Sequence, residues 1–99
     1  MEKIYIAGVV PERAEDGGGY SVYIPDVPQV AAGGETVTEA IDNATSALRL
    51  ALRDLAERRA ALPEPSGMPQ VRAAVRAERT EDGLGYPDST VYQDIPALI

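Results

Sequence analysis

The feature that most constrains this chain is one long stretch of helical periodicity, residues 36–62. Apolar side chains recur there at spacings of three and four, which places them along one side of an α-helix. Thr36 is a favoured N-cap residue, and Glu39 can reach back to complete a capping box. Pro63 has no amide hydrogen to donate and disfavours helical geometry before it, so we expect the helix to end there. An apolar stripe of this length needs an apolar surface to lie on.

The residues before this helix are typical of β-strands. Residues 3–10 are β-branched or apolar with no strongly polar face, so we expect a central strand covered on both sides. Apolar and polar residues alternate in residues 19–25, and the glycine-rich connection before them predicts an antiparallel hairpin with a long loop. We expect a short third strand at residues 29–32, after which Gly33 and Gly34 turn the chain into the helix.

The last third of the chain predicts a smaller helix and a final strand. Residues 68–78 have helical spacing, with Ser66 as a possible cap after a proline-rich connection. Residues 80–88 contain glycine and proline breakers and predict a loop. Residues 89–95 predict a last strand, stopped by Pro96.

The predicted fold class is α+β. One domain over residues 1–99 has the order β-β-β-α-[α]-β, with a small antiparallel or mixed sheet and one long helix packed across it. The chain contains no cysteine and no histidine. This excludes disulfide bonds, thiolate chemistry, and Ser–His or Cys–His catalysis within the chain.

The net charge limits the classes of partner. A formal charge of −7 argues against a free-standing nucleic-acid binder and suits a basic partner, although acidity can also serve solubility alone. Nothing in the sequence is typical of a signal peptide or of a membrane-spanning run. We therefore expect a cytoplasmic protein with no membrane association.

Residues 16–66 carry five features in a fixed order. They are a glycine run before an aromatic residue, a turn with Pro25, Asp26 and Pro28, a Gly-Glu-Thr helix start, an alanine-rich helix and a proline-rich exit. Together these features resemble the HicB family, the antitoxins of type II HicA–HicB toxin–antitoxin pairs. The resemblance implies a partial RNase H-like fold, in which one long helix crosses a small sheet. It also implies a HicA-like partner, a small mRNA-cleaving toxin whose active site the antitoxin covers.

The chain departs from the family's pattern at two places. Many members carry a C-terminal helix-turn-helix or ribbon-helix-helix module, but only residues 96–99 follow the predicted last strand. We therefore do not expect direct DNA binding by this chain. Gln29 and Val30 follow the Pro-Asp-x-Pro turn, where the family pattern has a glycine and often a cysteine. Members commonly dimerise, and open sheet edges would allow a homodimer or a higher homo-oligomer here.

The candidate toxin-binding residues are Tyr23, Pro25, Asp26, Pro28, Gln29 and Leu50. Asp26 can accept hydrogen bonds from the toxin or bond within its own turn. Tyr20 and Tyr23 fall on opposite faces of their strand, with Tyr20 assigned to the core and one tyrosine available as an anchor. Leu50 lies off the apolar stripe, either as a partner or dimer contact or as an ordinary exposed leucine.

Arginines spaced along the second helix leave two interpretations open. Arg72, Arg76 and Arg79 form either a basic stripe for nucleic acid or a solvated face paired with Glu78 and Glu81.

A metal-dependent nuclease is the third function considered. Such an enzyme needs clustered carboxylates, including one on the first strand. Residues 4–10 contain no acid, and Asp42 is the nearest imitation of a second ligand. We expect no catalytic residue, no metal and no cofactor. The function predicted is a non-catalytic antitoxin; the alternative is an orphan domain of this fold that binds a protein or a small ligand without a toxin.

Overall fold

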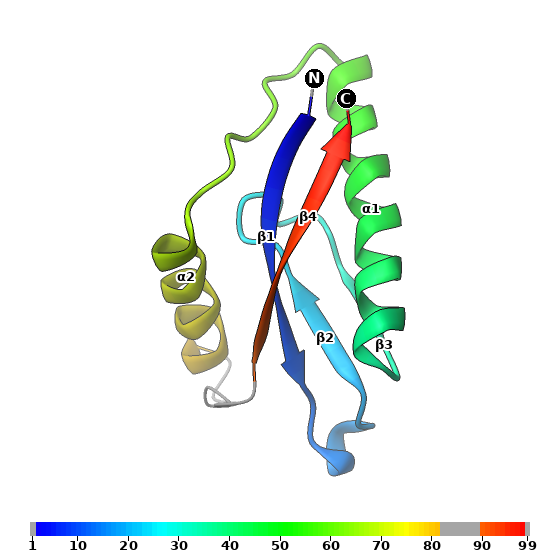
Figure 1. Ribbon diagram of the computed structural model, residues 1–99, viewed down its shortest axis with the longest axis vertical. Coiled ribbons are helices and arrows are strands. Elements are labelled where there is room, and N and C mark those ends of the chain that lie inside the picture. Colours follow the sequence, from blue (N-terminus) through cyan, green and yellow to red (C-terminus); the bar gives the residue numbers. More distant parts are fainter. Residues whose placement is uncertain (1, 82–89, 99) are drawn as a thin grey trace.

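The computed structural model describes residues 2–81 and 90–98, and within them the protein is α+β. A four-stranded antiparallel sheet has the order β3-β2-β1-β4, with one helix on each face (Figure 1). The elements are β1 (Glu2–Pro11), a 3₁₀ turn η1 (Ala14–Asp16), β2 (Tyr20–Tyr23), β3 (Ala32–Gly34), α1 (Val37–Glu57), α2 (Met68–Glu81) and β4 (Val91–Leu98).

The prediction that the first strand is covered on both sides is confirmed for most of its length. Tyr5, Ala7 and Val9 are fully buried in the core beneath α1, whereas Val10 is buried on the other face beneath α2. Ile4 is the exception at 48% exposed, because α2 lies over the other half of β1 (Figure 1). The predicted hairpin is also confirmed, since β1 and β2 pair antiparallel.

The start of α1 confirms the predicted N-cap. The Thr36 hydroxyl accepts from the Glu39 N–H at 3.1 Å. The Glu39 carboxylate accepts from the N–H of Glu35 at 3.2 Å, one residue before the position that a capping box uses. The stripe is confirmed as well: its buried members face the sheet, and two of them are alanines, which lets the helix approach closely.

The prediction that this helix continues to the prolines is wrong. It ends at Glu57, and Arg59 adopts a left-handed conformation with φ of 56°. The Arg59 N–H donates to the Ala56 carbonyl oxygen at 3.0 Å, and the Ala60 N–H donates to the Leu55 carbonyl oxygen at 2.9 Å. These two bonds form a Schellman motif, which satisfies the last helical carbonyls. The residue in the left-handed position is an arginine where glycine is usual, so the sequence carried no signal of this end.

The third strand lies later than predicted. Residues 29–32 were expected, but β3 comprises Ala32–Gly34, because successive turns occupy the residues before it. Gly33 and Gly34 are therefore strand residues and not a turn. A Cβ on Gly33 would lie 2.6 Å from the Tyr20 carbonyl oxygen, so only glycine allows this approach of β3 to β2.

The predicted end of the last strand is also wrong. Pro96 lies inside β4, opposite Ile4 of β1. Because β4 is an edge strand of the described sheet, it can accommodate a proline, which has no N–H to donate.

The second helix is confirmed and is longer than predicted. Val71 and Val75 are buried against the sheet, and α2 continues to Glu81 into the first residues of the predicted loop. The rest of that loop and Ser89 lie outside the described residues.

Candidate partner-binding site

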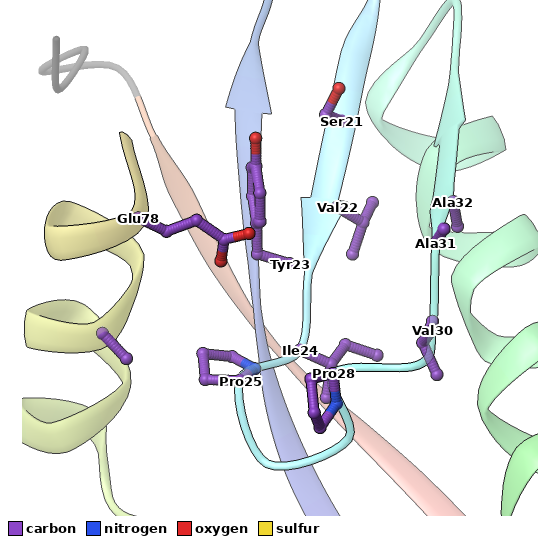
Figure 2. Close-up of a pocket in the computed structure, with 11 residues that line it drawn as sticks. Ser21, Val22, Tyr23, Ile24, Pro25, Pro28, Val30, Ala31, Ala32 and Glu78 are labelled. Carbon is purple, nitrogen blue, oxygen red and sulfur yellow. The ribbon is translucent and has the colours of Figure 1, made fainter. Parts of the chain in front are cut away.

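An open groove of about 500 Å³ lies on the α2 side of the sheet. Figure 2 shows its floor on β2, with α2 on one side and the segment that leads into β3 on the other. The groove exists because α2 packs chiefly on β1, so that no helix or strand of residues 2–81 and 90–98 covers this face of β2 and β3 (Figure 1). Its lining residues are Ser21, Val22, Tyr23, Ile24, Pro25, Pro28, Val30, Ala31, Ala32, Ala74 and Glu78.

The structure brings five of the six predicted site residues together. Tyr23, Pro25 and Pro28 line the groove, and Asp26 and Gln29 belong to the same short segment of chain. Gln29 is exposed. The sixth, Leu50, is 66% exposed as predicted, but it lies on α1 and therefore on the opposite face of the sheet.

The two tyrosines of β2 face opposite sides, as predicted. Tyr20 packs half-buried against the core beneath α1. Tyr23 packs half-buried against the small cluster beneath α2 and presents its ring to the groove (Figure 2). Tyr23 is therefore the tyrosine that lines the candidate site.

Asp26 has a function in the fold that neither predicted use describes. Its two carboxylate oxygens accept from Ser66, one from the backbone N–H at 2.7 Å and one from the hydroxyl at 2.6 Å. Ser66 lies 40 residues away in the connection between the helices. The hydroxyl of Ser66, which the sequence offered as a cap for α2, is thus directed at Asp26. The first turn of α2 is closed by the Gly67 carbonyl oxygen, which accepts from the Val71 N–H.

Two further contacts hold the same connection to β1. The Tyr5 hydroxyl donates to the Pro63 carbonyl oxygen at 2.5 Å, and Lys3 pairs with the exposed Glu64 at 3.1 Å. Burial raises the pKa of the Tyr5 phenol, and the negative charges of Glu64 and Asp26 raise this pKa further. We call Pro63, Glu64 and Ser66, with these partners, the linker clasp. It fixes the path of the chain from α1 to α2.

Sequence reasoning missed eight of the eleven lining residues named above, and two of these eight, Ala74 and Glu78, belong to α2. No local pattern marks them, because their relevance depends on how α2 sits beside β2. Arg72 of the same helix lies over the Tyr92 ring, 4.7 Å from its centroid, which is a cation–π contact with the sheet. Arg76 is exposed, and the side chain of Arg79 lies outside the description.

Comparison with known proteins decides the family. The profile described as "HicB_like antitoxin of bacterial toxin-antitoxin system" matches residues 5–80, more than half of the chain. The chain belongs to the HicB-like antitoxin family. No curated protein matches it.

Solved structures share the fold of this HicB-like antitoxin. A "Toxin-Antitoxin complex from Streptococcus pneumoniae" matches with a TM-score of 0.79 at 21% identity, over 99% of this chain and 70% of that chain. The "N-terminal domain of Burkholderia Pseudomallei antitoxin HicB" matches with a TM-score of 0.71 at 22% identity, over 100% of both chains. A "HicA3 and HicB3 toxin-antitoxin complex" matches with a TM-score of 0.61 at 22% identity, over 93% of this chain and 94% of that chain. At these identities the likeness establishes the fold alone.

The groove offers apolar contact and one carboxylate, which is the chemistry of a binding surface. Among the residues that the structure describes, no group of three or more His, Cys, Asp or Glu side chains could hold a metal ion. Asp42, considered above as a metal ligand, is an exposed residue of α1. In the same part of the chain, neither α1 nor α2 is long and apolar enough to cross a membrane.

Proposed function

We propose that this HicB-like antitoxin is non-catalytic, and that it binds a HicA-like, mRNA-cleaving toxin and covers the active site of that enzyme. The observation that carries the proposal is the family match over residues 5–80. Two of the solved structures with this fold are described as toxin–antitoxin complexes, which supports a protein toxin as the partner. Such a toxin acts where mRNA is translated, so the proposed location is the cytoplasm.

The proposed toxin-binding surface is the groove and the segment beside it. Tyr23, Pro25 and Pro28 supply apolar and aromatic area, which is the usual source of binding energy at an interface. Gln29 is exposed at its edge, and Asp26 supports the surface through its bonds to Ser66. Leu50, on the other face, is proposed as a separate contact, either with the toxin or with a second copy of the chain.

The net charge supports the choice of partner. A chain with a formal charge of −7 attracts a basic protein, which raises the rate of encounter and disfavours acidic competitors. Two finer expectations belong to this proposal: the partial RNase H-like description of the fold, and a homodimer or higher homo-oligomer formed through an open sheet edge.

A small basic protein encoded beside this gene would be the expected toxin, and co-expression with it tests the proposal. The tagged antitoxin should co-purify with that protein and should relieve the growth arrest that the protein causes alone. An Asp42→Asn variant removes one negative charge from the exposed side of α1, away from the groove. It is the control for a general effect of charge and should co-purify and relieve the arrest as the wild type does. Failure of the wild type both to co-purify and to relieve the arrest would contradict the proposed function.

A second measurement tests the non-catalytic part of the proposal. Purified antitoxin incubated with labelled RNA and Mg²⁺ or Mn²⁺ should leave the RNA intact. Metal-dependent cleavage that persists through further purification steps would show that the chain itself is an enzyme.

A further inference from the structure

The two faces of the sheet are covered to different extents. Beneath α1, buried side chains extend from β1 and β4 through β2 to the segment before β3. On the opposite face, α2 buries Val10 together with Val71 and Val75, and Tyr23 and Tyr92 only pack against this small cluster. The groove is the part of that face that no described element covers, and its volume of about 500 Å³ leaves room for one more layer of side chains.

The groove combines apolar walls with a single charged side chain. Among the lining residues that the structure describes, Glu78 alone is charged. Figure 2 shows the Glu78 carboxylate turned into the groove toward the Tyr23 side chain, with Pro25 and Pro28 at the lower end. Glu78 has no hydrogen bond or ion pair with any residue that the structure describes. Glu78 is exposed, so solvent can reach its carboxylate.

This arrangement selects the chemistry of the occupant. A wholly apolar surface that closed the groove would remove water from the Glu78 carboxylate and leave a charge without a partner, which is strongly unfavourable. A cationic group would replace that water with a charge-assisted hydrogen bond. Arginine fits better than lysine, since its planar guanidinium stacks on an aromatic ring while it binds a carboxylate. Arg72 of the same helix already makes such a ring contact, with Tyr92 of the same sheet face.

We propose that the groove receives an arginine side chain of the basic toxin. Its methylene stem lies between Pro25 and Ala74, and its guanidinium meets the Glu78 carboxylate beside the Tyr23 ring. This inference rests on the proposed function and adds to it the residues of α2 and the chemistry of the contact. A second copy of this chain is a poorer occupant of the groove, because a chain with a formal charge of −7 has fewer cationic side chains to offer Glu78 than a basic protein has.

The test uses isothermal titration calorimetry with a catalytically inactive form of the co-purified toxin. Glu78→Gln should weaken binding by about tenfold to a hundredfold, because it leaves a buried guanidinium without its anion. Glu57→Gln is the matched control: it removes the same charge from an exposed position on α1, and the affinity should stay within about twofold. Ala31→Trp places a large side chain in the groove from an exposed position, so it should also weaken binding without unfolding the protein.

A double-mutant cycle identifies the arginine. Each toxin arginine is replaced by lysine and measured against wild type and Glu78→Gln; at one position the two losses should be strongly non-additive. Thermal unfolding and circular dichroism show that the antitoxin variants remain folded.

If the wild type binds and Glu78→Gln binds equally well, or if no arginine couples to Glu78, this inference is wrong while the proposed function stands. Absence of binding by the wild type refutes both. A groove variant that changes only the oligomeric state would assign the groove to a second copy and also overturn the inference.

Discussion

The two helices of this protein pack on opposite faces of one sheet, and they do so unequally. Among the described residues, the cluster beneath α1 contains thirteen buried residues, whereas the cluster beneath α2 contains three. The difference follows from sequence and length. α1 has 21 residues with a continuous apolar stripe, and it contacts all four strands; α2 has 14 residues and packs chiefly on β1.

The α1 face of the sheet supplies most of the stability of the fold, whereas the α2 face supplies the candidate binding surface. Because burial of apolar area drives folding, the α1 face carries most of the hydrophobic stabilisation. The α2 face is thinner and depends in addition on the linker clasp, which fixes where α2 begins. It is also the face that keeps an open groove. Four predictions test this division, in order of decreasing effect.

Leu48→Ala should have the largest effect on stability. Leu48 is fully buried beneath α1, and its truncation leaves a cavity among well-packed neighbours. We expect the free energy of unfolding in urea to fall by about 3 kcal/mol. The exposed Leu50→Ala on the same helix is the control and should change it by less than about 0.5 kcal/mol. Equal losses at the two positions would contradict the assignment of the core.

Asp26→Ala should release the connection between the helices. The variant loses the acceptor for two Ser66 donors and leaves the backbone N–H of Ser66 without its partner. We expect a loss of about 2 kcal/mol in the free energy of unfolding, because hydrogen bonds to a charged group are among the stronger ones. Hydrogen exchange should become faster in α2 than in α1. The loss should be non-additive with that of Ser66→Ala; additive losses would show that the two residues act independently.

Val75→Ala should cost less than Leu48→Ala and should act locally. It removes two methyl groups from a small cluster, so we expect a loss of about 1.5 kcal/mol in the free energy of unfolding. Amide exchange should rise in α2 while the α1 face stays protected. Ala77→Gln, at an exposed position of the same helix, is the control: glutamine is a good helix former, so the free energy of unfolding should change by less than about 0.5 kcal/mol. Global loss of protection in Val75→Ala would mean that the two faces fold as one unit.

Tyr5→Phe should have the smallest effect at neutral pH and should change the alkaline limit of stability. The variant loses the hydrogen bond to the Pro63 carbonyl oxygen, worth about 1 kcal/mol. The folded protein holds the phenol proton more tightly than the unfolded chain, because the pKa of Tyr5 is raised by burial and by the charges of Glu64 and Asp26. This contribution to stability is complete below the unfolded pKa of about 10 and is lost as the pH rises above it.

The measurement is urea unfolding of the wild type and of Tyr5→Phe from pH 8 to pH 11. The difference between their free energies of unfolding should shrink above about pH 10. A constant difference would show that the Tyr5 proton does not stabilise the fold.

Several elements were predictable because their information is local. The stripe and the N-cap of α1 were visible as spacing and residue type, and the structure has both. The hairpin of the first two strands and the apolar side of α2 were predicted for the same reason. The wrong predictions concern the end of α1, the position of β3 and the proline inside β4. The reasons differ: α1 ends at a left-handed arginine that the sequence does not signal, β3 is placed by its pairing with β2, and β4 accommodates a proline because it is an edge strand of the described sheet.

The candidate site also contains residues that the sequence predicted and residues that it did not. Tyr23, Pro25 and Pro28 were found from the sequence because they adjoin one turn, but Ala74 and Glu78 belong to another helix and were missed. Leu50 was rightly predicted to be exposed, yet the sheet separates it from the other candidates. Helical spacing is enough to predict that a single residue is exposed. To predict which exposed residues share one surface, the packing of the helices on the sheet must be known.

The sequence by itself determined the start and the apolar stripe of the long helix, the hairpin of the first two strands and the family, because each depends on residues close together in the chain. Only the tertiary structure decided that the Asp26 carboxylate holds Ser66, and that α2 leaves half of one sheet face open beside Glu78. The physical reason is distance along the chain. Residues 26 and 66, or 23 and 78, become neighbours only after the sheet and both helices have packed. The periodicity of the sequence does not predict these contacts.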